Sequence, residues 1–323
     1  FGIFRPSIYA IYVLTIALLF YVSGKDIIDS NFVLESGLIV IFYSYIEKLF
    51  TPIQNLAEQF NVLQAALAAG ERIYDVLTTK SELEDEEGAI EVDHLDGEIE
   101  FKNVWFAYVE EDWILKDVSF KVNAKENVAF VGATGSGKTT ILSLIVRNYD
   151  IQKGQILIDG LDIKKYKIAS LRKHIGQMLQ DVFLFSGTVE SNITLRSDDI
   201  SSDIVKEACR FVNADKVIDK LPNKYNEIVR ERGKNFSSGE RQLISFARVV
   251  SHKPNIMILD EATSNIDTET EALIQDSLKK MMNIGTMLIV AHRLSTIQHC
   301  DKIIVLKKGR IIESGTHLEL LDK

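Results

Sequence analysis

The sequence predicts an α/β domain built on a largely parallel core sheet and preceded by two transmembrane helices. Two observations carry this prediction. Residues 6–24 of the 323-residue chain contain no Asp, Glu, Lys or Arg. After residue 97, short β-rich runs alternate with helical runs, the pattern of a parallel sheet whose strands are joined by helices.

Composition excludes some classes of function. The formal net charge is −9, so no overall basic field is available to hold nucleic acid, and we expect no nucleic-acid partner. The two cysteines, Cys209 and Cys300, are too few for a disulfide framework and indicate a reducing compartment.

The first predicted span covers residues 6–24, close to the roughly 20 apolar residues that cross a bilayer. A signal sequence is the alternative, but it has a shorter apolar core followed by a small-residue cleavage site. The long run here ends in Ser23, Gly24 and Lys25, which favours a span. Because the chain begins with Phe1 and not Met, we expect a fragment whose earlier helices are missing.

The second predicted span lies between Glu35 and Glu58 and is interrupted only by Glu47 and Lys48. These two charges either lie in solvent near the interface or face a polar pathway, since charge inside a bilayer is costly. Both interpretations remain open. The short polar linker over residues 24–36 requires the two spans to run antiparallel.

A helical pattern continues over residues 59–77, and an acidic run over residues 81–88 indicates a solvated linker. We therefore expect a membrane part with a helical extension over residues 1–80, a linker over residues 81–96 and an α/β domain over residues 97–323.

Alternating or apolar β-rich runs predict the strands of this domain. They are residues 98–104, 118–122, 128–131, 156–158, 256–259, 287–290 and 303–306. Helices are predicted between them. Their ranges are residues 139–146, 202–211, 238–250 and 269–282.

The strongest motif is Gly-Ala-Thr-Gly-Ser-Gly-Lys-Thr at residues 132–139, between a predicted strand and a predicted helix. Its glycines let backbone N–H groups face a phosphate at a helix N-terminus. In this pattern Lys138 supplies charge to the β- and γ-phosphates, and Thr139 supplies a hydroxyl for Mg²⁺. The candidate nucleotide-binding residues here are Gly132, Thr134, Gly135, Ser136, Gly137, Lys138, Thr139 and Thr140.

Two carboxylates end the apolar run over residues 256–259. Asp260, beside a phosphate loop, suits Mg²⁺ held directly or through water. Glu261 follows, in a position to polarise water that attacks the γ-phosphate. The alternative, an acidic pair that only caps the next segment, is less consistent with a phosphate loop upstream.

A third motif narrows the function further. Residues 235–242 read Asn-Phe-Ser-Ser-Gly-Glu-Arg-Gln, shortly before Asp260. Here the chain resembles the ATP-binding cassette (ABC) family, which carries a Leu-Ser-Gly-Gly-Gln signature in this place. The resemblance implies a P-loop ATPase with a mixed core sheet, an antiparallel β subdomain and an α-helical subdomain. It covers residue 97 to the end, and the preceding spans are similar to the last two helices of an exporter half-transporter.

Other family elements occur in order, and their roles follow from the resemblance. Tyr108 matches the aromatic residue that stacks on adenine, and Gln180 matches a glutamine that senses Mg²⁺. Asp267 matches a residue that bridges to the partner cassette, and His292 matches a histidine that contacts the γ-phosphate. Residues 231–233, Glu-Arg-Gly, resemble a short coupling element of exporters.

The signature departs from the family pattern at Phe236, Ser238 and Glu240, whereas Ser237 and Gly239 are kept. Ser237 and Glu240 form the S-x-x-E pattern of a capping box. Alternatively, the Glu240 carboxylate repels ATP held by the opposite cassette, in which case E240Q would tighten ATP-driven closure. Capping is the favoured interpretation.

The resemblance implies the ATP-binding and ATP-hydrolysing half of an ABC exporter in a multi-pass cell-membrane protein, with its cassette in the cytoplasm. It implies ATP and Mg²⁺, a second half-transporter as homodimer or heterodimer partner, and an exported substrate of unknown identity. The implied catalytic residues are Glu261, His292 and Gln180. The implied metal ligands are Thr139, Gln180 and Asp260. The further residues implied to bind the nucleotide are Ser237, Ser238, Gly239 and Glu240 of the signature, together with Asp267. A soluble non-transport ABC ATPase and a cassette that gates without hydrolysis are the alternatives.

Overall fold

The computed structural model describes residues 4–28, 36–81, 83–179, 181–260, 268–290 and 297–321. The chain forms two compact units, Phe1–Glu82 and Leu83–Lys323. Four expected site residues, Gln180, Glu261, Asp267 and His292, lie outside the described residues.

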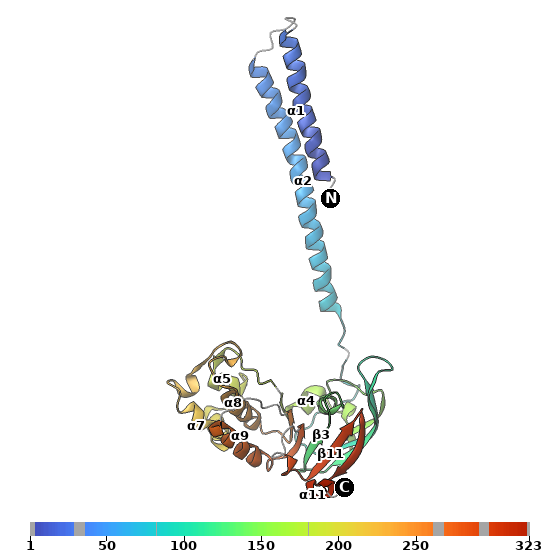
Figure 1. The fold of residues 1–323 in the computed structure, drawn as a ribbon, viewed down its shortest axis with the longest axis vertical. Helices are drawn as coiled ribbons and strands as arrows, with labels where there is room; N and C mark the ends of the chain where they lie inside the picture. The colour runs from blue at the N-terminus through green and yellow to red at the C-terminus, as the bar shows by residue number, and fades with distance from the viewer. Residues whose placement is uncertain are drawn as a thin grey trace. The chain divides into compact units, whose positions relative to one another are not determined.

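The first unit is a helical hairpin. Helix α1 spans Phe4–Ile28 and α2 spans Ser36–Thr78, so the predicted extension continues the second helix without a break. Figure 1 shows the two helices side by side and antiparallel, as the short linker predicts. The rings of Tyr12 and Phe50 meet edge to face across the hairpin, with centroids 5.5 Å apart.

Within the described residues, one helix segment is long and apolar enough to cross a membrane by length and composition, Pro6–Asp26. Most of its side chains point outward, and Leu14 and Tyr21 are more than two-thirds exposed. The second span, in α2, stays a prediction because Glu47 and Lys48 interrupt its apolar run.

The second unit contains a six-stranded mixed sheet in the order β12-β11-β3-β10-β9-β6. Neighbouring strands from β11 to β6 pair in parallel, and only the edge strand β12 is antiparallel to its neighbour. The strands are β3 (Asn127–Val131), β6 (Ile175–Met178), β9 (Ile256–Asp260), β10 (Thr286–Val290), β11 (Lys302–Lys307) and β12 (Arg310–Gly315).

A smaller antiparallel sheet has the order β2-β1-β4-β5. Its strands are β1 (Ile99–Ala107), β2 (Trp113–Val122), β4 (Lys153–Ile158) and β5 (Leu161–Asp162). A two-stranded ribbon pairs β7 (Gly187–Thr188) with β8 (Ile228–Val229).

The helices of the second unit include all four that the sequence predicts. They are α3 (Lys138–Ile145), α4 (Ile168–Lys173), α5 (Val189–Thr194), α6 (Ser202–Phe211), α7 (Asp215–Ile218), α8 (Ser238–Ser251), α9 (Thr268–Met281) and α11 (His317–Leu321). Short 3₁₀ helices lie at Ile163–Lys165, Lys224–Asn226 and Glu231–Gly233. The seven predicted strands are confirmed as parts of β1, β2, β3, β4, β9, β10 and β11, whereas the short strands β5 to β8 and the edge strand β12 were not predicted.

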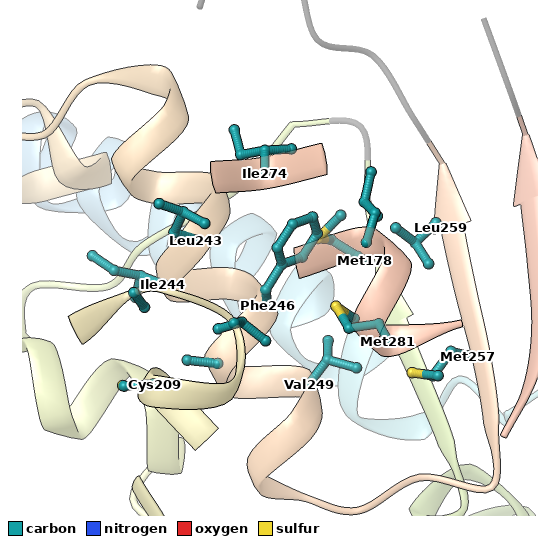
Figure 2. Packing of buried hydrophobic residues seen from close by; sticks show 14 of the residues in the cluster. Met178, Cys209, Leu243, Ile244, Phe246, Val249, Met257, Leu259, Ile274 and Met281 are labelled. Carbon is teal, nitrogen blue, oxygen red and sulfur yellow. The ribbon is translucent and has the colours of Figure 1, made fainter. Parts of the chain in front are cut away.

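Two hydrophobic clusters lie on opposite faces of the six-stranded sheet. Alternate residues of β9 enter different clusters, as expected when successive strand side chains point to opposite faces. The first cluster, the α8 cluster, contains Phe246 and other residues of α8 together with Met257 and Leu259 of β9. Figure 2 shows Phe246 among methionine and aliphatic side chains. Ile256 and Ile258 join the α3 cluster, which the antiparallel sheet covers.

The connection between the units differs from the expected solvated linker over residues 81–96. The chain divides at Glu82, and residues from Leu83 onward belong to the second unit. The Asp85 carboxylate accepts a hydrogen bond of 2.7 Å from the Ile168 N–H at the start of α4. Leu95 is fully buried in the α3 cluster. Part of the acidic run therefore caps a helix, where a carboxylate is favoured.

Candidate nucleotide-binding site

The phosphate loop connects β3 to α3, at the carboxyl edge of the parallel strands, where ligands of open α/β sheets bind. Gly132 has φ +151°, and a Cβ there would lie 2.2 Å from the backbone oxygen of Leu306 on β11. Gly135 has φ +78° with open space around it. The loop thus needs glycine for two reasons, close packing at its first position and a left-handed backbone at its fourth.

Lys138 begins α3 and is almost fully buried, at 6% exposure. Its ammonium donates to the backbone oxygens of Gly132 and Ala133 over 2.8 and 3.1 Å. Burial lowers the pKa of Lys138, and the charge of Asp260 opposes this shift. A cation that is desolvated and held by two neutral carbonyl groups is well placed to receive an anion, which would offset the cost of its burial.

The loop also holds a buried polar atom without a partner. Ser136 Oγ is buried and makes no hydrogen bond within the described part of the chain. Such a group is costly unless a ligand or water satisfies it. The carbonyl oxygen of Ser136 accepts a hydrogen bond of 3.2 Å from the N–H of Gly309, in the turn between β11 and β12. This contact holds the backbone of Ser136 in place. Sequence reasoning missed Gly309, whose only signal is a glycine between two β-rich runs.

The predicted metal ligands that are described lie together. Thr139 Oγ1 donates to Asp260 Oδ2 over 3.4 Å, between the start of α3 and the end of β9. A hydroxyl and a carboxylate beside a phosphate loop are hard oxygen donors of the kind that Mg²⁺ prefers. Among the described residues, no group of three or more His, Cys, Asp or Glu side chains gathers to hold a metal ion. The pair therefore suits a Mg²⁺ that takes further ligands from outside this described pair, such as phosphate and water.

Tyr108 follows β1 and is half exposed, at 51%. Its hydroxyl lies 3.2 Å from Thr140 Oγ1, so the aromatic ring and the phosphate loop are joined by a hydrogen bond. The Tyr108 ring also packs edge to face with the rings of Phe106 and Tyr149, and its centroid lies 4.9 and 5.1 Å from theirs. An exposed ring held this close to the loop suits a nucleobase whose phosphates lie in the loop.

Three predicted site residues come in the sequence just after strands that end at the carboxyl edge of the sheet. Val290 of β10 pairs with Phe130 of β3 and with Asp260 of β9, so the three strands reach the edge in one row. Glu261 and His292 come one and two residues after β9 and β10 in the sequence, and Gln180 comes two after β6. Their own placement is outside the described residues, and their roles stay predictions.

The signature segment begins α8 and carries the predicted capping box. Ser237 N–H donates to the Glu240 carboxylate over 2.7 Å, and Glu240 N–H donates to Ser237 Oγ over 3.2 Å. The predicted capping box between Ser237 and Glu240 is therefore confirmed. Phe236, which stands where the family has leucine, is buried in the α8 cluster. This segment and the phosphate loop begin helices that pack on opposite faces of the sheet.

A cavity of about 460 Å³ lies elsewhere, between the end of α4, β6, α6 and the end of α8. None of its lining residues belongs to the phosphate loop. The candidate site is thus identified by its donor groups and not by cavity size.

The chain is similar to known ABC transporters in sequence. Residues 115–264 match the family described as "ABC transporter". A probable multidrug resistance ABC transporter ATP-binding/permease protein of Bacillus subtilis is 44% identical over 306 residues, covering 95% of this chain and 45% of the relative. The ATP-dependent lipid A-core flippase of Syntrophus aciditrophicus is 39% identical over 305 residues, covering 94% and 50%.

A solved structure is also similar. The structure of a bacterial Atm1-family ABC exporter with ATP bound superposes with a TM-score of 0.74 at 34% identity, covering 98% of this chain and 54% of that one. The chain spans about half the length of the curated relatives that it matches. The match over residues 115–264, the mixed sheet and the phosphate loop together show that the second unit contains an ABC transporter ATP-binding domain.

Proposed function

We propose that the chain is the ATP-binding and ATP-hydrolysing part of an ABC exporter half-transporter. The observation that carries this proposal is the phosphate loop itself. It combines a buried, desolvated Lys138 with the orphaned hydroxyl of Ser136. Both groups gain a partner when a phosphate chain binds at the N-terminus of α3. The names of similar exporters support the step from ATP binding to transport.

ATP would bind with its base on Tyr108 and its phosphates in the loop. The loop amides and Lys138 would neutralise the β- and γ-phosphates, and the hydroxyls of Thr139 and Thr140 would add donors. Mg²⁺ would be held by Thr139 and Asp260, with Gln180 as the further expected ligand. Bound there, the ion supplies positive charge to the phosphates during phosphoryl transfer.

Hydrolysis would depend on two residues that follow parallel strands in the sequence. Glu261 would act as general base toward water, and His292 would orient the γ-phosphate. The signature of a second cassette would close on this nucleotide, so that Ser237, Ser238, Gly239 and Glu240 serve the partner's site. Asp267 would bridge between the two cassettes.

The membrane part of the proposal rests on α1 and on the predicted span in α2. An apolar helix whose side chains point outward suits contact with lipid. As in the exporters that the chain resembles, the ATP-binding domain would lie in the cytoplasm, and the first unit would belong to a multi-pass segment of the cell membrane. The partner would be a second half-transporter, as homodimer or heterodimer, and the exported substrate is of unknown class.

Equilibrium binding of MgATP to the intact chain tests the first step. K138A should weaken binding at least tenfold, because a charged donor to two phosphates is removed, whereas the exposed K206A on α6 should bind as the parent does. Equal affinity of K138A and K206A would refute the phosphate-loop assignment.

Membrane sedimentation tests the second step. The chain should stay with membranes after a high-salt wash, which removes proteins held only by charge. Release into the supernatant would instead support the soluble non-transport ATPase.

A further inference from the structure

Residues 149–152 lie between α3 and β4. They contact the backbone of Ala107, at the end of β1, and the ring of Tyr108, which follows it. Gln152 contributes the closest contacts. Its amide nitrogen donates to the Ala107 oxygen over 2.9 Å, and its amide oxygen accepts from the Ala107 N–H over 3.1 Å. One side chain thus satisfies both backbone groups of Ala107, as a neighbouring strand would.

Ala107 is the last residue of β1, and the next residue is Tyr108. The β1–β2 pairing is irregular here, with a register shift between Phe106 and Ala107. Regular strand pairing therefore does not by itself set the direction in which the chain leaves β1. The Gln152 amide supplies two hydrogen bonds at this irregular point.

Tyr149, from the same segment, contacts the ring of Tyr108. The two rings meet at 85° with centroids 5.1 Å apart, and Tyr149 also lies 5.7 Å from the buried ring of Phe106. Edge-to-face pairs of this kind contribute beyond the area they bury. Tyr108 thus contacts the Phe106 ring, the Tyr149 ring and the Thr140 hydroxyl, while about half of its surface stays open.

The segment is anchored on its other side. The buried Arg147 donates to the Asp150 carboxylate over 3.3 Å and to the backbone oxygens of Lys164 and Tyr166 over 3.3 and 3.2 Å. Arg147 is 1% exposed, and its hydrogen bond to the Tyr166 oxygen is buried. The segment is therefore attached at Asp150, through Arg147, to the backbone around residues 164–166.

We propose that Gln152 is a positioning residue for nucleotide recognition, which holds Tyr108 in the orientation that receives the nucleobase. This inference rests on the proposed function, since it assumes that ATP is the ligand. It predicts that Gln152 affects the base of the nucleotide and not its phosphates.

The test compares two probes on the intact chain, MgATP and magnesium tripolyphosphate, which lacks a base. Q152A should raise the Kd for MgATP roughly three- to tenfold, as expected when two partly buried hydrogen bonds that position Tyr108 are lost. It should leave the Kd for tripolyphosphate within about twofold. In Q152E a carboxylate oxygen would replace the donor and face the Ala107 oxygen, so its Kd for MgATP should rise at least as much as that of Q152A. The control is Q155A, an exposed glutamine on β4 whose side chain makes no hydrogen bond in the described part of the chain.

A double-mutant cycle with Y108A separates positioning from general damage. In the Y108A background, Q152A should produce no further loss of MgATP affinity. An unchanged Kd for MgATP in Q152A, an equal loss for both probes, or additive losses in the double variant would each overturn the inference. Failure of the parent chain to bind either probe would instead overturn the proposed function.

Discussion

Glu240 is the clearest case in which two physical roles of one residue can be separated. Its carboxylate accepts from the Ser237 N–H at 2.7 Å, at the N-terminus of the fourteen-residue helix α8. Removing the side chain in E240A deletes that hydrogen bond, worth about 1 kcal/mol for a helix cap. It also deletes a favourable charge–dipole interaction of about 0.3–1 kcal/mol. We expect E240A to lower the free energy of unfolding by about 1–2 kcal/mol.

E240Q separates the two contributions. Glutamine keeps the acceptor oxygen and therefore the capping box. It loses only the charge, so we expect a loss of about 0.3–1 kcal/mol, smaller than that of E240A.

Urea unfolding of the intact chain, followed by tryptophan fluorescence, measures these differences. Both tryptophans, Trp105 and Trp113, lie in the second unit, so the signal reports on the domain that contains α8. For a slope of about 3 kcal/mol per molar urea, E240A should shift the midpoint by about 0.3–0.7 M. Coincident midpoints for the parent, E240A and E240Q would refute the capping argument.

The same variants test the role toward ATP. If the carboxylate repels the partner's nucleotide, E240Q should dimerise at lower ATP concentration than the parent. Equal ATP affinity and equal dimerisation would exclude repulsion and leave capping as the reason for Glu240.

Two further predictions follow from burial. Because burial lowers the pKa of Lys138, ATP affinity should fall at an alkaline pH below the ordinary lysine pKa of 10.5, since only the charged form binds phosphate. K138R keeps its charge, so its Kd should change less with pH, and parallel Kd–pH curves would contradict this. Burial raises the pKa of Cys209 from 9.0 to about 12. The neutral thiol therefore contributes stability below pH 9 that is lost as the pH rises toward 12, and in a C300S background Cys209 should react with a thiol reagent at pH 8 only after unfolding in urea. Labelling of Cys209 in the folded chain would contradict the second prediction.

Local patterns predicted much of the ATP-binding domain. The strands β3, β9 and β10 are short apolar runs whose ends carry the motifs, and parallel pairing brings those ends to one edge. The capping box of α8 was also predictable, because it joins residues three apart in the sequence. In both cases the information lies within a few neighbouring residues.

Other features depend on contacts between distant parts of the chain. Gly309 supports the loop at Ser136 through its backbone, and backbone hydrogen bonds leave no mark on residue type. Gln152 meets Ala107 across 45 residues, and nothing in its neighbourhood distinguishes it from Gln155. The acidic run beginning at Ser81 has the composition of a linker, although Asp85 caps α4. Composition indicates that a segment is polar enough to be solvated. It does not indicate which N–H group a side chain such as Asp85 will contact.

The proposed function requires that this chain binds ATP in its phosphate loop and hydrolyses it with Glu261 as general base. The most direct measurement compares MgATP affinity and steady-state ATP turnover for the parent and for E261Q. We predict that E261Q binds MgATP with an affinity close to that of the parent and turns it over about 10²–10⁴ times more slowly, the range for loss of a general base. Near-normal turnover in E261Q would exclude Glu261 as the general base.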